Sequence, residues 1–263
     1  MRINGSVIGS VITSSISSAT GIWGLQNVEI GNRLNSWPII YITSGLKLIL
    51  DAANTNSYPG SGTSWYDLSG NNNTGTLTNG PTFSAANQGT ILFDGTNDYV
   101  SFNNSGTSTS FDFGTGDMTF TFWMLPSAWG DGASRGIISK KANDSTNGWV
   151  IYNDGGYPAK LNARLGLQNN FPTSTSVSTS VYQYWTLTRS STTLTWYCNG
   201  ILDSTGSNST NVSDTTVELQ VGRSQTWNGN FKGNISNIAF YNRALTATEI
   251  LQNFNALRYR FGV

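Results

Sequence analysis

The fold class is most evident from one stretch, Ile91-Leu-Phe-Asp-Gly-Thr-Asn-Asp-Tyr-Val-Ser-Phe102. It begins with an apolar run and turns after Asp94, which brings Asp98 back within reach of that residue. Beyond the turn, Val100 and Phe102 alternate with polar residues, which is the period of a half-buried strand. The two carboxylates can either hold a cation or cap the turn by accepting hydrogen bonds from backbone N–H groups.

Composition argues against several classes of partner. The chain has 263 residues, of which 11% are charged, and its 14 basic residues balance its 14 acidic ones. This neutrality predicts no nucleic-acid partner and no attraction to an anionic membrane. The sequence lacks the run of about 18 apolar residues that a membrane span needs, so no membrane insertion is expected. Residues 1–20 also make a poor export signal.

The polar residues are mostly Asn, Ser, Thr and Gly, and nine Trp accompany them. This mixture suits a protein that binds sugars or assembles with other proteins, and it suits equally a β protein with a Trp-rich core. The absence of His and the single Cys198 exclude Ser-His-Asp chemistry, His-ligated metals and an intrachain disulfide.

Short apolar runs separated by turn residues predict an all-β domain. Met118–Leu125 is apolar on both faces, as a central strand of two stacked sheets requires. Leu161–Gln168 alternates strictly and predicts a strand with one wet face. Asn199-Gly200 predicts a tight hairpin, because a type I′ turn needs positive φ at both central residues. The remaining strands are expected at 45–51, 137–140, 148–152, 184–189, 194–198, 217–222 and 234–241.

One helix is expected near the C-terminus. Thr246-Ala-Thr-Glu249 is a capping box, which marks a helix start. The apolar residues behind it lie at helical spacing and predict a helix over about 247–257, packed on the sandwich through one stripe. The stripe consists of Ile250, Leu251, Phe254 and Leu257.

Several motifs resemble those of concanavalin A-like domains of the laminin G type. The opening stretch is similar to "F-D-G-x-x-D-Y", and Phe231–Ile250 is similar to the family's closing "F-x-G-x-I-D-x-V-x-I-Y-N-R-A-L-S-x-x-E-I". Trp185 and the Tyr197–Gly200 turn stand where the family has "W-x-x-V" and "Y-V-N-G". The resemblance implies a jelly-roll sandwich of two antiparallel sheets with one C-terminal helix over residues 42–263.

The resemblance also bears on cofactors and activity. It implies a possible Ca²⁺ site, with Asp94 and Asp98 as ligands, but the Asp of the family's "G-x-I-D" is Ser236 in this chain. Losing that carboxylate weakens a hard-cation site, so turn capping stays open as the alternative. Enzymes of the family use a clustered E-x-D-x-x-E, and Glu29, Glu218 and Glu249 do not form it. We therefore predict no enzymatic activity.

The N-terminal 41 residues differ from the rest and predict an arm. Four apolar residues lie in a segment too short to bury them, namely Trp23, Leu25, Val28 and Trp37. Exposed aromatic residues of this kind dock onto a partner, or else pack on their own domain. The segment resembles the "T-G-x-W-x-L … W-P" arm of tailed-phage virion proteins. That resemblance implies docking to other virion proteins or to sister subunits.

Three polar loops carry aromatic residues that could stack on sugar rings. The expected glycan-binding residues are Trp129, Asp131 and Arg135 in the first loop, Tyr157 in the second, and Trp227 and Asn228 in the third. The alternative is that these aromatic residues anchor their own loops. Together these observations predict a non-enzymatic protein of the virion surface, of decoration or fibre type, made in the host cytoplasm. A bacterial or secreted adhesion module and a glycan hydrolase are the alternatives.

Overall fold

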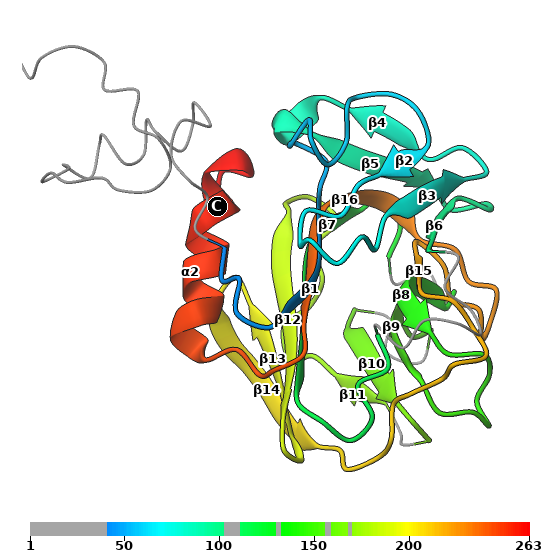
Figure 1. Ribbon diagram of the computed structural model, residues 1–263, viewed down its shortest axis with the longest axis vertical. Helices are drawn as coiled ribbons and strands as arrows, with labels where there is room; N and C mark the ends of the chain where they lie inside the picture. Colours follow the sequence, from blue (N-terminus) through cyan, green and yellow to red (C-terminus); the bar gives the residue numbers. More distant parts are fainter. Residues whose placement is uncertain (1–40, 103–110, 130–132, 156–158, 168–169) are drawn as a thin grey trace, which may run out of the picture. The chain divides into compact units, whose positions relative to one another are not determined.

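The computed structural model describes residues 41–102, 111–129, 133–155, 159–167 and 170–263. In this part of the chain two antiparallel β-sheets pack face to face, with one helix outside them (Figure 1). The predicted all-β sandwich is confirmed. The predicted arm, with Trp23, Leu25, Val28 and Trp37, lies outside the described residues and stays a prediction. No helix in the described ranges is long and apolar enough to cross a membrane.

The first sheet is built around the ten-residue strand β16 (Lys232–Tyr241), which pairs with β7 (Met118–Pro126) on one side and with β5 (Thr90–Asp94) and β1 (Leu46–Asp51) on the other. The sheet runs on through four further strands, in the order β14-β13-β12-β7-β16-β5-β4. These are β4 (Thr82–Ser84), β12 (Gln183–Ser190), β13 (Thr193–Cys198) and β14 (Ile201–Ser207).

The second sheet has the order β11-β10-β9-β8-β15-β6-β3-β2. Its strands are β2 (Ser64–Trp65), β3 (Gly75–Thr78), β6 (Tyr99–Ser101), β8 (Arg135–Lys140), β9 (Trp149–Asn153), β10 (Leu161–Leu165), β11 (Phe171–Pro172) and β15 (Gln220–Val221). The stretch Ile91–Phe102 therefore joins the two sheets, because β5 lies in the first and β6 in the second.

The core lies between the sheets. Phe120 of β7 stacks on Trp149 of β9, with ring centroids 4.2 Å apart. On the opposite face of β7, Trp123 stacks on Phe254 at 5.6 Å and on Phe261 at 4.3 Å. Both faces of β7 are thus covered, which confirms the prediction of a central strand.

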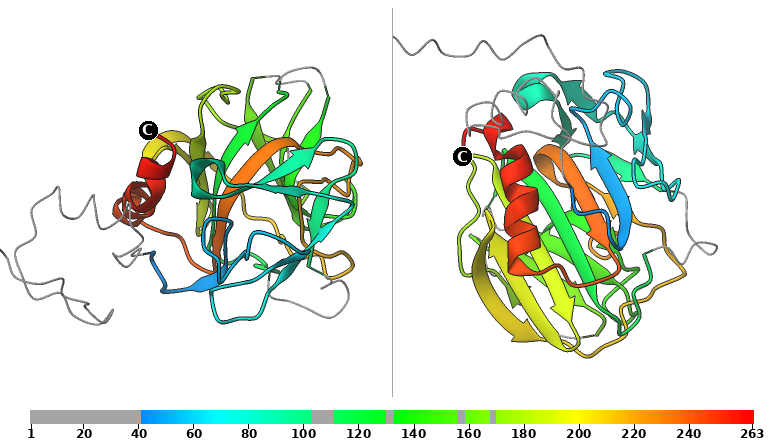
Figure 2. Two further views of the ribbon diagram at one scale, coloured as in Figure 1. Left: turned by 90° about the horizontal axis from the view of Figure 1, so that it is seen from above. Right: turned by 60° about the vertical axis from the view of Figure 1, so that its left-hand side comes forward.

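Helix α2 (Ala247–Leu257) lies across the outer face of the first sheet (Figure 2). Ile250, Phe254 and Leu257 are buried, as predicted. The placement of Leu251 in the buried stripe is wrong, because this side chain is 43% exposed. The helix instead buries the polar side chain of Asn253. Its Nδ2 donates to Tyr241 Oη at 3.1 Å, and its Oδ1 accepts from the Ile42 N–H at 3.1 Å.

The capping box at the start of α2 is confirmed, and it makes stability depend on pH. The Glu249 carboxylate accepts from the Thr246 N–H and pairs with Arg243 at 2.7 Å. The bond from Arg243 lowers the pKa of Glu249 from 4.5 to about 2. Because this pKa is depressed in the folded state, the stabilisation is present above about pH 4.5 and is lost as the pH falls toward 2.

We expect Glu249→Ala to lower the free energy of unfolding by about 1 kcal/mol at neutral pH. Glu249→Gln should cost less, because the amide keeps the hydrogen bond to the helix start but loses the ion pair. Urea denaturation at neutral pH and near pH 2 measures both variants. A loss from Glu249→Gln that is equal at the two pH values would contradict the ion-pair argument.

Two predictions about hairpins and exposed faces had different outcomes. The Asn199-Gly200 turn is confirmed, with φ of 51° and 79° between β13 and β14. The prediction of a wet face on β10 is wrong, since Asn162 is fully buried. Asn162 pairs with Tyr152 on β9, and Trp227 from the connection between β15 and β16 packs on Tyr152. A loop distant in sequence therefore covers this part of the face.

Candidate functional site

Two of the predicted glycan-binding loops meet at the end of the second sheet where β8 begins. The connection between β15 and β16 lies directly on this strand, and the Gly136 N–H donates to Gly229 O at 3.1 Å. A Cβ at Gly136 would lie 2.1 Å from the Ser224 nitrogen, so glycine is required for this approach. The strand thereby holds the loop that carries Trp227 and Asn228.

Trp227 is half-buried and packs on Tyr152, whose hydroxyl belongs to a small polar cluster. Its ring lies 4.5 Å from that of Tyr152, at an interplanar angle of 39°. The Tyr152 hydroxyl contacts Asp154 Oδ2 at 3.2 Å and Asn170 Oδ1, and the Asn170 amide donates to the same Asp154 oxygen. Burial and the nearby Asp154 carboxylate raise the pKa of Tyr152, so its hydroxyl stays protonated. The corner therefore combines one indole ring with phenol, amide and carboxylate groups.

Trp129 and Arg135 lie at the same end of the sheet but are held by structural contacts. Trp129 packs against the core, and its Nε1 lies 3.1 Å from the amide of Asn153, which accepts the hydrogen bond when oriented to face this donor. Arg135 Nη1 is 3.4 Å from Asn230 O. These contacts agree with the loop-anchoring alternative for Trp129. The structure thus brings the two loops together.

Asn228 is exposed, and its Oδ1 accepts from Arg223 Nη2 at 3.0 Å. The Arg223 guanidinium also lies over the Tyr99 ring, 5.4 Å from its centroid. Of the remaining predicted residues, Asp131 and Tyr157 fall outside the described ranges.

The sequence did not point to Tyr152, Asp154, Asn170 or Arg223 as members of this corner. Tyr152 falls in an apolar strand, and Asn170 is one Asn among many in a polar chain. Asp154, which precedes two glycines, carried the only usable signal, since acids in glycine-rich turns often face ligands.

The Asp94–Asp98 turn contacts the third loop through Asn230, and the two acids cap the turn itself. Asp98 Oδ2 accepts from the Asp94 N–H at 3.0 Å, and Asp94 Oδ1 accepts from the Thr96 N–H at 2.7 Å. Accordingly, the hydrogen bond from Thr96 lowers the pKa of Asp94, whereas burial raises the pKa of Asp98. Asn230 Nδ2 donates to Thr96 O at 2.7 Å and ties the turn to the third loop.

The side chains present do not fit the calcium set that the family resemblance implied. Ser236 is fully buried and accepts a hydrogen bond from Arg260 Nη2 at 2.7 Å, so a cation there would lie beside a guanidinium. In the ranges that the structure covers, no three His, Cys, Asp or Glu side chains come close enough together to hold a metal. The positive charge next to Ser236 is supplied by the chain's own arginine.

Sequence comparison agrees with this architecture. The sequence profile of the concanavalin A-like lectin/glucanases superfamily, in its laminin G form, matches residues 94–251. The chain belongs to this superfamily. The match begins at the turn acid Asp94 and ends within α2, so it includes the corner and most of both sheets of this concanavalin A-like domain. No curated protein matches the sequence.

Solved structures with the same fold include two toxin-derived binding domains. The binding domain of Paraclostridial Mosquitocidal Protein 1 has a TM-score of 0.63 at 20% identity, over 81% of this chain and 52% of that one. The receptor binding domain of botulinum neurotoxin C/D mosaic serotype has a TM-score of 0.58 at 14% identity, over 81% and 52%.

A Trypanosoma rangeli sialidase has a TM-score of 0.57 at 16% identity, over 79% of this chain and 32% of that one. The concanavalin A-like chain thus spans about half or less of the length of these three structures. At such identities the likeness shows the fold alone.

Proposed function

We propose that this protein binds glycans, without chemical turnover, through the corner where Trp227 packs on Tyr152, whose hydroxyl contacts Asp154 and Asn170. The supporting observation is this grouping of an incompletely buried indole ring with hydrogen-bonding groups on three separate segments. An indole ring offers an apolar face to a pyranose, and carboxylate and amide groups bond sugar hydroxyls with defined direction. Exposed Asn228 extends the polar rim of the same loop.

The absence of catalysis is part of the proposal. Glycoside hydrolysis requires two carboxyl groups at the bond, one of them with a raised pKa. Glu249 is engaged by Arg243 and the start of α2, which hold its pKa at about 2. Glu218 bonds Ser101 and Gln220 instead. A glycan hydrolase remains the alternative, and release of reducing ends from a polysaccharide panel would favour it.

The proposed setting is the surface of a virion, with residues 1–41 attaching the protein to other virion proteins and to sister subunits. This rests on the similarity of that segment to tailed-phage arms and on the apolar residues it carries. The names of two structures with this fold describe a binding domain and a receptor binding domain, which favours a recognition role for the sandwich. A bacterial or secreted adhesion module is the alternative setting.

Glycan binding is tested with the full chain on a polysaccharide and host-cell panel, with and without calcium. We expect saturable binding that Trp227→Ala weakens by about tenfold or more, equivalent to at least about 1.4 kcal/mol. Tyr66→Ala serves as the control, because Tyr66 is a 47% exposed aromatic residue that directly follows β2, at the edge of the second sheet opposite β11. Trp227→Phe should retain part of the affinity.

Equal binding by Trp227→Ala and the unmodified chain would reject this corner. Binding to no glycan, while the chain still attaches to particles through residues 1–41, would favour a purely structural decoration protein. Circular dichroism on each variant shows whether a loss of binding reflects a loss of fold.

A further inference from the structure

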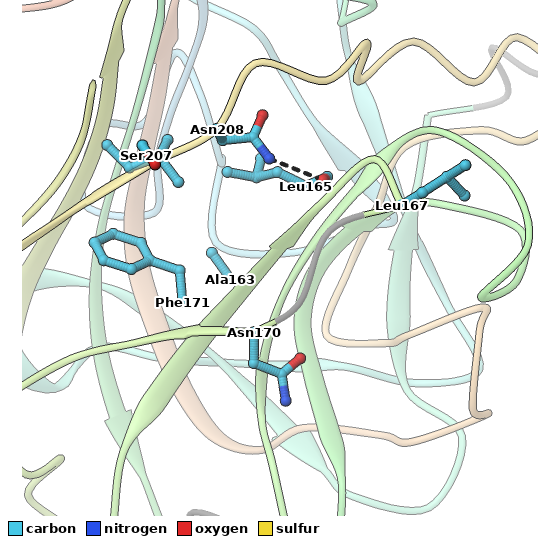
Figure 3. A pocket seen from close by; sticks show the side chains of 8 residues that line it. Ala163, Leu165, Leu167, Asn170, Phe171, Ser207 and Asn208 are labelled. Carbon is cyan, nitrogen blue, oxygen red and sulfur yellow. Dashed lines mark hydrogen bonds between the residues drawn. The ribbon is translucent and has the colours of Figure 1, made fainter. Parts of the chain in front are cut away.

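A cavity of about 490 Å³ opens between the two sheets at their edges and shares Asn170 with the Trp227 corner (Figure 3). Its floor consists of side chains of the hydrophobic core, Ala163, Leu165 and Leu194, each at most 2% exposed. Phe171 forms one wall, and Leu167, 58% exposed, lines it as well. The cavity therefore ends on core side chains that are almost fully buried, and Leu167 and Phe171 supply most of its accessible apolar surface.

Hydrogen bonds between the sheets frame this opening on both sides. On one side Trp196 Nε1 donates to Phe171 O at 3.0 Å, and Ser204 Oγ donates to Pro172 O at 3.2 Å. These bonds tie β11 of one sheet to β13 and β14 of the other, and the Phe171 ring lies against the backbone of Gly206.

On the other side Asn208 Nδ2 and Thr210 Oγ1 both donate to Leu165 O, each at 3.0 Å. Asn208 is itself buried and fixed, since its Oδ1 accepts from Arg189 Nη1 and from the Thr210 backbone N–H. The gap between the two sets of bonds is therefore a preformed opening and does not depend on a ligand to separate the sheets.

The lining selects by polarity. None of the described residues that line the cavity is ionisable, and the polar ones, Asn170, Ser207 and Asn208, lie where the sheets end. A charged group entering here would lose its hydration without an opposite charge among the described lining residues, which is unfavourable. An apolar group gains contact with leucine and phenylalanine side chains.

We propose that this cavity is a second binding site, for a small neutral molecule whose apolar part enters between the sheets. Its polar end would meet Ser207 at the mouth. This inference is tested independently of glycan binding, because the two sites share Asn170 but none of the side chains varied below belongs to the Trp227 corner.

Titration of the full chain with N-phenyl-1-naphthylamine, a neutral apolar fluorescent probe, tests the site. We expect saturable binding with one probe per chain. Ala163→Leu, which fills the floor, should weaken binding by about tenfold or more. Leu167→Ser, at the mouth, should weaken it less and leave the core intact.

Leu202→Ser is the matched control, because Leu202 is also 58% exposed but does not line the cavity. Unchanged binding by this variant, together with the two losses, supports the site. Binding that Leu202→Ser abolishes and Leu167→Ser leaves unchanged would overturn the proposal, as would a lack of saturation. Should Ala163→Leu fail to fold, the comparison of Leu167→Ser with Leu202→Ser decides between these outcomes.

Discussion

Replacing Arg260 by alanine is expected to lower the free energy of unfolding by about 3–5 kcal/mol, because it leaves a buried carboxylate unpaired. Arg260 is 6% exposed and its partner Asp51 is 3% exposed. The guanidinium contacts both Asp51 oxygens, at 2.9 and 3.1 Å, and donates to Ser236 Oγ and Gly89 O. The pair thus ties the C-terminal segment to β1 and β16.

Chemical denaturation of Arg260→Ala against Arg258→Ala measures this effect. Arg258 is two residues away, exposed, and lies over the Phe254 ring at 5.9 Å, so its loss should cost little. A double variant, Asp51→Leu with Arg260→Met, should lose less stability than Arg260→Ala, since no buried charge remains unpaired. Equal stability of Arg260→Ala and Arg258→Ala would show that the buried pair contributes nothing.

Lys141→Met is expected to lower the free energy of unfolding by about 3 kcal/mol, because it leaves the buried carbonyl of Gly166 and two partly buried carbonyls without a donor. The side chain is fully buried, and its ammonium donates to three backbone oxygens, those of Thr146, Asn147 and Gly166. These carbonyls belong to the β8–β9 connection and to the residue that follows β10. One ammonium group thus holds two neighbouring loops.

The matched control is Lys232→Met, since Lys232 lies exposed at the start of β16. We expect this variant to unfold within about 0.5 kcal/mol of the unmodified protein. Hydrogen exchange should locate the damage from Lys141→Met in residues 142–148. A loss of stability equal in the two methionine variants would contradict the role assigned to the buried ammonium.

Regular elements were predictable because their signals are local. The strands flanking Asp94, the hairpin at Asn199-Gly200 and the capping box at Thr246 each depend on residues within a few positions of one another. Leu251 shows the limit of such patterns. Helical spacing alone does not state which residue at the border of an apolar stripe meets the sheet, and the buried position went to Asn253.

The candidate site was only partly predictable. The loops of Trp129 and Trp227 were recognised as polar segments with aromatic residues, and the structure brings them to one end of the second sheet. Their separate roles depend on distant partners. Trp129 faces Asn153, and Trp227 covers Tyr152, which belongs to a strand that looked purely apolar.

Local sequence patterns were thus sufficient to predict the fold class, because alternation, turn residues and helix caps act between neighbours in the chain. The composition alone excluded reactions and metal sites that need histidine, and it showed that the chain has no net charge. Long-range packing settled the rest. Segments far apart in sequence meet at the buried Lys141 and Arg260, at the cover over β10 and at the cavity between the sheets. At such places a polar residue that the local sequence predicts to be exposed becomes buried and needs a hydrogen-bond partner.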